Sequence, residues 1–531
     1  MIICIIPAKG SSKRLENKNM SLLNNKPMLY YSVKAAKESR LIDRIYVSTD
    51  SKEVAEFAKK LGVRVIIRPS ILAGEAPLLD VYRHALKEIK DTNVSYVVGL
   101  QPDHPDRKIV IDKSITFMKQ KGFDDLLTVD GSGKKNGSLR IIKKEALCSG
   151  KIALTGTLLD NCTNIHTRSD LLKAERRLLG KQCVIKVDNK TIGEDAPVFI
   201  VAEGANNHLC DVNIAKKMIV EAKNAGADAI KFQTFKAERL VTKNSPVFWN
   251  MPGVKTQLDF YKTIDKFNKK EYKILFNYAK EKGIICFSTP FDCDSATMLH
   301  ELGMPLFKTA SCDLVDVRLI RHIAKFGKPM VISSGASELD EIRKAIDAVY
   351  EVGNFQIVLL SCTLSYPTKV NDANLLRIDA LRGFFPELII GISDHTEPDE
   401  NMILPALAVS LGVKFIEKHF TLDRNFPGLG HKFCVEPDEL SKMIKNIRLA
   451  EIAMGSRQIM VYEAEKGARQ NARRSLVANR DIKRGERITD AMIGVKRPGT
   501  GLSPACIDKI ISRVVKCDIK NEEQFTFEQL K

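Results

Sequence analysis

The stretch KFIEKHF, residues 414–420, begins like a buried β-strand and ends with Glu417, Lys418 and His419 in succession. Its apolar start is typical of a strand that is covered on both faces, as in a parallel sheet. One such strand with a polar end would mean little. Seven earlier stretches of the chain end in the same way, so the pattern repeats.

The repeat begins near residue 198 and alternates short apolar runs with longer amphipathic ones. A representative amphipathic stretch, DVNIAKKMIVEAKNAG (211–226), has apolar residues three and four positions apart and ends in glycine, as a helix does. Eight such strand–helix units predict a (β/α)8 barrel within an α/β chain. The eight apolar runs are VFIVAE (198–203), AIKFQT (229–234), ICFSTP (285–290), LFKTAS (306–311), PMVISSG (329–335), IVLLSCT (357–363), LIIGISDH (388–395) and KFIEKHF.

The carboxyl ends of barrel strands line the face where active sites of this fold lie. A polar cap at the point where a strand surfaces would explain any one of these ends. It does not explain eight ends so rich in lysine, histidine and hydroxyl groups, so we expect a site there. The ends carry Glu203, Lys231, Gln233, Ser288, Thr289, Lys308, Ser311, Ser333, Ser334, Ser361, Thr363, Ser393, Asp394, His395, Glu417, Lys418 and His419.

The residue types at these ends indicate the chemistry. Lys231 and Lys308, with several hydroxyl groups and no P-loop, suit a phosphate and a carboxylate on one small ligand. His395 and His419 end the last two strands, so we expect their imidazoles to lie side by side. With neighbouring carboxylates they suit a divalent ion that keeps open positions for substrate oxygens.

Composition limits the class of protein. The chain has 531 residues, 44% of them hydrophobic and 28% charged, which predicts a soluble protein of two to four domains. It lacks an apolar run of the roughly 20 residues that would span a bilayer, and its start resembles a first strand more than a signal peptide. The scattered cysteines are expected to be reduced, in a cytoplasmic protein.

The formal net charge of +18 allows a nucleic-acid partner as one interpretation. However, the chain has no run of five basic residues and no stripe of basic and aromatic residues. Anionic small substrates explain the charge more simply, so we expect no nucleic-acid or membrane partner.

Several motifs resemble those of the sialic acid synthase family. They run collinearly from about residue 183 to the end of the chain. The motifs are AEGANNH (202–208), KFQTF (231–235), FSTPFD (287–292), FKTASCD (307–313), ISDHT (392–396), EKHFTLDRNFPGLGHKFCVEP (417–437) and VKRPGTG (495–501).

The resemblance implies a reaction in which phosphoenolpyruvate condenses with N-acetylmannosamine or a related 2-acetamido-hexose to give a nonulosonic acid and phosphate. It implies Mn²⁺ or Mg²⁺ on His395 and His419. The implied catalytic residues are Glu203, Lys231, Lys308 and Asp313, and the implied substrate contacts are Asn207, Gln233, Thr289, Ser311, Ser333, Tyr366, Ser393 and Arg497. The chain departs from the family at Asp313 (usually Glu), at Ala205, and at Gly430, where an aspartate usually contacts the sugar.

The tail from about residue 465 has short β-runs between glycine-rich turns, with one short helix expected near 504–512. It resembles the antifreeze-like (SAF) domain that closes these synthases. That resemblance implies a domain-swapped homodimer in which Arg497 contacts the acyl group of the substrate in the partner's barrel. Without the family context, Arg497 would be interpreted as a surface residue in a turn.

The front of the chain has four strands, each followed by a polar loop. The first, MIICIIPAKGSSKRLENKN (1–19), supplies backbone N–H groups and cations suited to phosphates. With RIYVSTD (44–50), VRVIIRP (63–69) and YVVGLQPDHPDR (96–107) it resembles the cytidylyltransferases that activate sialic acids, which have a Rossmann-like fold. The residues implied in nucleotide binding are Lys9, Ser12, Lys13, Lys18, Asn19, Arg68 and Gln101, with Asp50 also following the pattern.

In this front region the family carries a pair of metal-binding aspartates where TNIHTRSDL (163–171) offers Asn164 and His166. We expect Asp103 and Asp160 to supply oxygen ligands for Mg²⁺ in their place.

The first hypothesis is therefore a bifunctional enzyme with domains 1–180, 181–460 and 465–531, which makes the acid and couples it to CMP from CTP. An alternative is a synthase whose front domain only binds a nucleotide or sugar. A third, an unrelated aldol reaction in a phosphate-binding barrel, is disfavoured by the continuous motifs.

Overall fold

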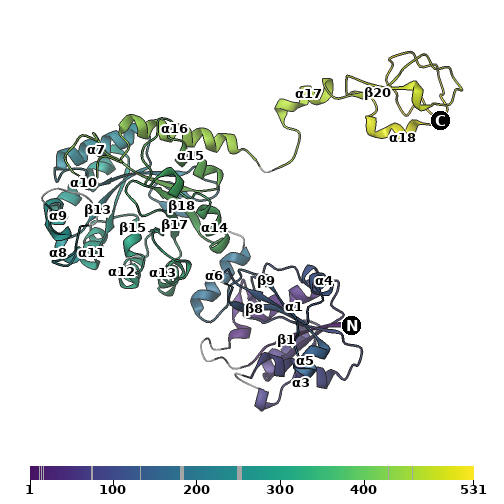
Figure 1. The fold of residues 1–531 in the computed structure, drawn as a ribbon, viewed down its shortest axis with the longest axis horizontal. Coiled ribbons are helices and arrows are strands. Elements are labelled where there is room, and N and C mark those ends of the chain that lie inside the picture. The colour runs from purple at the N-terminus through teal and green to yellow at the C-terminus, as the bar shows by residue number, and fades with distance from the viewer. Residues whose placement is uncertain are drawn as a thin grey trace. The chain divides into compact units, whose positions relative to one another are not determined.

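The computed structural model describes residues 1–531 except 11, 13, 14, 16, 73–75, 132, 180–183, 248–253, 429 and 457. One predicted nucleotide-binding residue, Lys13, lies outside the described residues. The chain forms two compact units, Met1–Met454 and Gly455–Lys531, which we describe separately (Figure 1). In the described part of the chain, no helix is both long enough and apolar enough to cross a membrane.

The first unit begins with a seven-stranded sheet in the order β5-β4-β1-β6-β8-β7-β9. Neighbouring strands are parallel except that β8 runs antiparallel to both β6 and β7. This is an open α/β sheet, as the strand–loop pattern predicts. The strands are β1 (Ile2–Pro7), β4 (Arg44–Thr49), β5 (Arg64–Ile67), β6 (Tyr96–Gly99), β7 (Asp125–Val129), β8 (Lys135–Lys143) and β9 (Thr155–Leu159).

Helices cover both faces of this sheet. Residues such as Val33, Val54 and Ile115 pack one face from α1 (Met28–Glu38), α2 (Lys52–Lys60) and α4 (Ile111–Lys121). Tyr82 and Leu147 pack the other from α3 (Leu78–Ile89) and α5 (Lys144–Ser149). A two-stranded sheet, β2 (Leu22–Leu23) with β3 (Lys26–Pro27), precedes α1, and α6 (Arg168–Leu179) follows β9.

The second part of this unit is a closed barrel of eight parallel strands, each paired with the next and the last with the first. The predicted (β/α)8 architecture is confirmed, and one barrel strand falls on each apolar run, although the first strand continues to Ala205, two residues past its run. Aromatic rings fill the barrel, with Phe199 stacked on Phe415 at 5.4 Å between centroids. The strands are β12 (Phe199–Ala205), β13 (Ala229–Thr234), β14 (Ile285–Pro290), β15 (Phe307–Thr309), β16 (Met330–Ser333), β17 (Ile357–Cys362), β18 (Ile389–Asp394) and β19 (Phe415–His419).

The barrel helices begin and end where local chemistry favours it. Asn268 and Glu271 form a capping box before α10, and Gly283 ends it in the left-handed conformation, which glycine adopts without strain. A two-stranded hairpin, β10 (Ile185–Val187) and β11 (Lys190–Ile192), packs into the barrel core. The helices are α7 (Val212–Ala225), α8 (Ala237–Leu240), α9 (Gln257–Ile264), α10 (Lys269–Lys282), α11 (Cys293–Glu301), α12 (Val317–Ala324), α13 (Leu339–Glu351), α14 (Arg377–Phe384), α15 (Ile403–Ser410) and α16 (Pro437–Met454).

The second unit is small and has its own core, which includes Leu476, Ile482, Ile510 and Phe525. Strands β20 (Ser475–Ala478) and β21 (Ile493–Lys496) pair antiparallel. Helix α17 (Lys466–Asn471) precedes them, and α18 (Ile507–Ile510) lies within the predicted 504–512 stretch. Arg497 directly follows β21 and is exposed within this unit.

Candidate active site

Glu203, Lys231 and Glu417 meet at the carboxyl ends of three neighbouring barrel strands. The strand register sets Glu203 beside Lys231 on one side and beside His419 on the other. Lys231 Nζ lies 2.7 Å from Glu203 Oε2 and 3.7 Å from Glu417 Oε2, and it donates to Thr289 Oγ1 at 2.8 Å. These side chains are almost entirely buried, so their charges interact in a medium much less polarisable than water.

A second lysine faces Glu417 from the other side. Lys308 Nζ donates to Ser333 Oγ at 2.6 Å and lies 4.0 Å from Glu417 Oε1. Ser393 Oγ donates to the same carboxylate oxygen at 2.8 Å. Glu417 therefore lies between two ammonium groups. The sequence pattern predicted that Glu417 belongs to the site but indicated no role for it.

The two carboxyl groups titrate in opposite directions. Burial and the charge of Glu417 raise the pKa of Glu203, although Lys231 opposes this. Burial also acts on Glu417, but Lys231 and Lys308 outweigh it and lower the pKa of that carboxyl. Glu417 is thus the ionised member of the pair, and Glu203 is the one suited to hold a proton.

His395 and His419 lie side by side, as predicted from their strands. Their ring centroids are 5.1 Å apart, and the ring of Tyr366 packs on both, at 4.3 Å and 5.5 Å. Burial lowers the pKa of His395 to about 4. Burial, together with nearby cationic side chains such as Lys231, lowers the pKa of His419 well below its usual range. Both imidazoles are therefore neutral at pH 7.

This pair fits a divalent metal ion. The carbonyl oxygen of Thr363 accepts a hydrogen bond from His395 Nδ1 at 2.8 Å, which leaves Nε2 as the nitrogen with a lone pair. A neutral imidazole fixed in this way is a common metal ligand. Among the described residues, no group of three or more His, Cys, Asp and Glu side chains suited to a metal occurs.

The loop after β15 adds a third carboxyl group. Asp313 ends a short 3-10 helix, Ser311–Asp313, and burial together with the nearby Asp316 raises its pKa to about 7. Ser311 Oγ accepts a hydrogen bond from the Gly335 amide at 3.1 Å. Asp313 is therefore close to half-protonated at neutral pH and can accept or give a proton.

Two predicted substrate contacts, Gln233 and Asn207, are engaged within the protein. Gln233 Nε2 donates to Glu203 Oε1 at 3.0 Å. Asn207 is buried, and its Nδ2 donates to the Phe420 carbonyl at 2.9 Å, so it braces the chain after β19. A Cβ atom on Gly430 would lie 2.7 Å from Asn207 Oδ1, so the family's aspartate would not fit here unless Asn207 moved.

The side chain of Lys418 lies outside the site, although Glu417 and His419 at the same strand end belong to the site. Successive side chains of a strand point to opposite faces, so Lys418 faces away from its neighbours Glu417 and His419. It is 1% exposed and donates to Asp394 Oδ2 at 2.8 Å and to the Thr396 carbonyl at 2.5 Å. This cluster ties β18 to β19 directly behind the two histidines.

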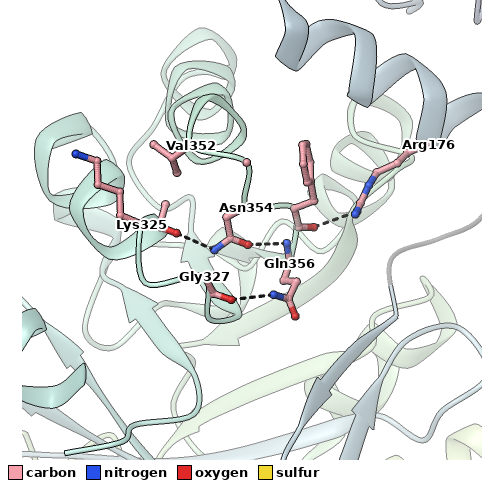
Figure 2. A pocket seen from close by; sticks show the side chains of 9 residues that line it. Arg176, Lys325, Gly327, Val352, Asn354 and Gln356 are labelled. Carbon is pink, nitrogen blue, oxygen red and sulfur yellow. Dashed lines mark hydrogen bonds between the residues drawn. The ribbon is translucent and has the colours of Figure 1, made fainter. Parts of the chain in front are cut away.

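A cavity of about 260 Å³ lies at the other ends of the barrel strands, away from these residues (Figure 2). Its polar lining is already hydrogen-bonded: Asn354 Nδ2 donates to the Lys328 carbonyl at 2.8 Å and Gln356 Nε2 to the Gly327 carbonyl at 3.1 Å. The N-terminal face of such barrels serves stability, so this cavity is not the catalytic site.

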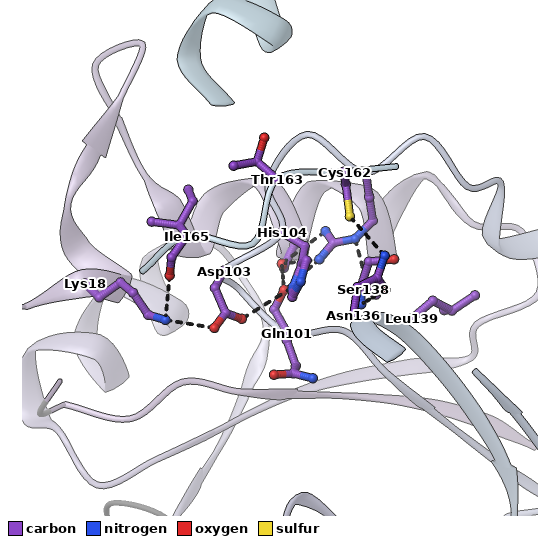
Figure 3. Close-up of polar contacts among 12 residues, drawn as sticks. Lys18, Gln101, Asp103, His104, Asn136, Ser138, Leu139, Cys162, Thr163 and Ile165 are labelled. Carbon is purple, nitrogen blue, oxygen red and sulfur yellow. Dashed lines mark hydrogen bonds and ion pairs between the residues drawn. The ribbon is translucent and has the colours of Figure 1, made fainter. Parts of the chain in front are cut away.

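In the front domain, Lys18 and Asp103 form an almost buried pair at 2.8 Å (Figure 3). Burial alone would raise the pKa of Asp103, but His104 and Lys18 outweigh burial and hold this pKa well below its ordinary value. Asn19 Nδ2 donates to the Lys9 carbonyl at 2.7 Å, which fixes the start of the phosphate-type loop.

The remaining predicted nucleotide contacts lie at the ends of neighbouring strands. Asp50 Oδ1 accepts from the Gly10 amide at 2.7 Å and lies 3.9 Å from the Arg68 guanidinium. The side-chain amide of Gln101 lies over Gly137, where a Cβ atom would come within 2.0 Å of it. Ser12 is half-buried in the loop after β1.

The two carboxylates predicted to bind Mg²⁺ are in different settings. Asp103 is paired with Lys18, whereas Asp160 is 2% exposed and accepts from Ser138 Oγ at 2.5 Å and from the Lys108 amide at 3.1 Å. The carboxylate of Asp160 thus has a structural role, because it accepts hydrogen bonds from two other parts of the front domain. A magnesium role for these two residues stays a prediction.

Comparison with known proteins places each part of the chain. Residues 218–459 match the NeuB family, residues 3–176 a cytidylyltransferase family and residues 473–531 the SAF domain. An N,N'-diacetyllegionaminic acid synthase of Legionella pneumophila is 36% identical, over 61% of this chain and 91% of that protein. An N-acetylneuraminate-9-phosphate synthase of Mus musculus is 34% identical, over 57% and 84% respectively.

A solved structure of a spore coat polysaccharide biosynthesis protein from Chromobacterium violaceum has the same fold. Its TM-score is 0.54 at 24% identity, and the match covers 63% of this chain and 99% of that one. The sequence relatives are matched over most of their length, and the barrel and its strand ends fall within the matched region. The chain therefore belongs to the NeuB family, with a cytidylyltransferase domain before its barrel and a SAF domain after it.

Proposed function

We propose that the barrel condenses phosphoenolpyruvate with N-acetylmannosamine or a related 2-acetamido-hexose to give a nonulosonic acid and phosphate. The observation that carries this proposal is the pair of buried lysines, each with a hydroxyl partner, on either side of Glu417 and beside two neutral histidines. The relatives named for legionaminic and N-acetylneuraminate-9-phosphate synthesis support the same chemistry.

In the proposed reaction, C3 of phosphoenolpyruvate attacks the aldehyde carbon of the open-chain hexose and forms the new carbon–carbon bond. Water then adds to C2 and loses one proton. The tetrahedral product collapses to a C2 ketone: the bond between C2 and the phosphate-ester oxygen breaks, and phosphate leaves with the proton of the C2 hydroxyl. The net change is one water consumed and one phosphate released. A proton leaves the water, and another reaches the aldehyde oxygen.

Lys231 and Lys308 bind the phosphate and carboxylate of phosphoenolpyruvate, with Thr289, Ser311, Ser333 and Ser393 as neutral hydrogen-bond partners. A charge-assisted hydrogen bond is about twice as strong as a neutral one, so the lysines orient the anion. Glu417 supplies the negative charge that faces both lysines before the substrate arrives.

Glu203 and Asp313 handle the protons. Glu203, whose pKa burial raises, gives a hydrogen bond to the aldehyde oxygen and then its proton. Asp313, with a pKa of about 7, takes the proton of the attacking water. A bound Mn²⁺ or Mg²⁺ on His395 and His419 would polarise the aldehyde.

For the front domain we propose transfer of CMP from CTP to the nonulosonic acid, with loss of pyrophosphate. The Lys9–Asn19 loop and Lys18 offset the charge of the triphosphate, with Mg²⁺ as the accompanying ion. Arg68 and Gln101 contact the nucleotide or sugar. We further propose a domain-swapped homodimer in which Arg497 of one subunit contacts the acyl group bound in the other.

The test is to supply purified protein with phosphoenolpyruvate, CTP and a panel of 2-acetamido-hexoses and to measure phosphate, pyrophosphate and product masses. We expect phosphate with at least one hexose and pyrophosphate only when CTP is also present. Phosphate release without pyrophosphate, even when nine-carbon acids are supplied, would favour a synthase whose front domain only binds a nucleotide or sugar. No phosphate with any hexose would refute the barrel assignment.

A further inference from the structure

Helix α6 contacts the barrel, within the same compact unit, through several side chains, and one of them, Arg177, is a buried arginine. The Arg177 side chain is 5% exposed, and its Nε donates to Glu387 Oε2 at 2.9 Å. Its Nη2 donates to the Phe384 carbonyl at 3.0 Å. Phe384 ends helix α14 and Glu387 lies in the loop that leads into β18, so both partners are on the N-terminal side of that strand.

The same guanidinium also contacts the front domain. Its Nη1 donates to the Asn161 carbonyl at 2.9 Å and to Thr163 Oγ1 at 3.4 Å, and it lies 3.5 Å from Asp106 Oδ2. Asp106 in turn accepts from the Thr163 amide at 2.9 Å and from its hydroxyl at 2.8 Å. Arg177 therefore holds the chain around Thr163 from the side of the barrel.

Two residues further on, the same segment reaches the nucleotide-type site. The Ile165 amide donates to the Asp103 carbonyl at 2.9 Å. The Ile165 carbonyl accepts from Lys18 Nζ at 3.0 Å, and Lys18 also pairs with Asp103 (Figure 3). We call residues 160–165 the bridging segment, because it contacts Arg177 near one end and Lys18 at the other.

The close fit at this contact leaves little freedom. The Glu387 side chain has no exposed surface, and its second oxygen lies 3.7 Å from Lys173 Nζ. A buried carboxylate is costly unless it is paired, so Glu387 fixes the position of Arg177. A Cβ atom on Gly131 of the front domain would come within 2.1 Å of the Phe384 ring, so the two surfaces meet closely there as well.

We propose that the barrel, through Glu387 and Arg177, positions the bridging segment and thereby Lys18 for nucleotide binding by the front domain. Arg177 is a positioning residue, because it acts through Thr163 and Ile165. The inference rests on the proposed CTP-dependent function of this domain. In this proposal Glu387, a carboxylate of the barrel, contributes to nucleotide binding by the front domain. It does so through Arg177, which lies 210 positions away in the sequence.

The test compares two neighbouring arginines of α6 in the full chain. Arg177→Met removes the contact with the bridging segment. Arg176→Met is the matched control, because Arg176 donates to the Phe355 carbonyl at 3.2 Å and its guanidinium lies 4.7 Å from the Phe355 ring centre (Figure 2). For Arg177→Met we expect CTP with Mg²⁺ to bind about tenfold more weakly by calorimetry, the effect of one lost charge-assisted hydrogen bond. For Arg176→Met we expect unchanged CTP binding, and for both variants unchanged phosphate release by the barrel.

A second variant separates positioning from loss of folding. Arg177→Met leaves Glu387 without its main partner, whereas Arg177→Met with Glu387→Met removes both charges and keeps apolar volume. We expect the double variant to recover thermal stability but not CTP affinity. Hydrogen exchange of the amides in residues 160–166 should be faster in both Arg177 variants and unchanged in Arg176→Met.

The outcomes distinguish this inference from the function on which it rests. Wild-type protein that binds no CTP would overturn the proposed nucleotide function, and the inference with it. Wild-type binding with the same CTP affinity in Arg177→Met would overturn the inference alone. Equal loss of affinity in Arg176→Met would also overturn it, because the effect would then come from general weakening of the contact between α6 and the barrel.

Discussion

Replacing Glu417 with glutamine removes one charge and almost no volume from the centre of the site. The carboxylate lies 3.7 Å from Lys231 Nζ and 4.0 Å from Lys308 Nζ. At an effective dielectric constant near 20, each of these pairs attracts by about 4 kcal/mol before desolvation is counted. Glu203, 2.7 Å from Lys231 Nζ, still offers Lys231 a hydrogen-bond acceptor, whereas Lys308 loses the carboxylate that it faces.

Loss of one partner from a buried ion pair costs about 3–5 kcal/mol. We therefore expect Glu417→Gln to lower the free energy of unfolding by about 3 kcal/mol without substrate, since Ser333 still accepts from Lys308. Phosphoenolpyruvate supplies negative charge at the same place. Its addition should therefore raise the melting temperature of Glu417→Gln more than that of the wild type.

The assay is thermal unfolding with and without phosphoenolpyruvate. Ser393→Ala is the comparison variant, because it removes the 2.8 Å hydrogen bond to Glu417 and a 3.3 Å contact with His395 Nε2 but no charge, and it should cost about 1 kcal/mol. A Glu417→Gln protein with wild-type stability and a wild-type response to phosphoenolpyruvate would refute the account of Glu417 as the counter-charge of both lysines.

Four further outcomes are expected. His419→Ala should weaken Mn²⁺ binding and abolish phosphate release; metal-dependent turnover near the wild-type rate would contradict the ligand assignment. Lys418→Met should lower stability by about 3 kcal/mol, because it leaves Asp394 buried without its partner, and should weaken metal binding without changing phosphoenolpyruvate affinity. Arg497→Ala should raise the KM for the hexose and leave the barrel folded, as judged by its unfolding transition; an unchanged KM would contradict the capping role. As pH falls from about 6.5 to about 4, the free energy of unfolding of the metal-free protein should drop by up to about 3 kcal/mol because of His395. In this range the imidazole gains a proton in the unfolded chain but not in the folded one. His395→Gln should flatten that part of the stability–pH curve.

The barrel and most of its site were predictable because the information is local. Each strand is a short apolar run, and its polar end falls on the catalytic face whatever the rest of the chain does. That placed Lys231, Lys308, His395 and His419 in one site before any contact was known. The alternation of side chains along a strand also predicts that Lys418 faces away from its two neighbours.

Other features depend on contacts between distant residues, which no local pattern records. The pairing of Arg177 with Glu387 joins residues 210 positions apart, and the burial of Asp160 against Ser138 joins residues 22 apart. The charge balance around Glu417 depends on three strands at once. For the same reason the predicted magnesium role of Asp160 was made without knowledge of its hydrogen bonds.

The place where α6 contacts the barrel has a consequence for the proposed pair of reactions. Phe355, Phe384 and Glu387 precede β17 and β18, whereas the site residues follow the strands, so the contact lies at the N-terminal face and the condensation site at the C-terminal face. The contact therefore leaves the catalytic face open to substrates. Because the contact is at the opposite face, the acid that we propose as the product of the barrel would not pass across it. In our proposal the contact instead sets the position of Lys18 through Arg177, and this gives a physical reason for the two domains to share one chain.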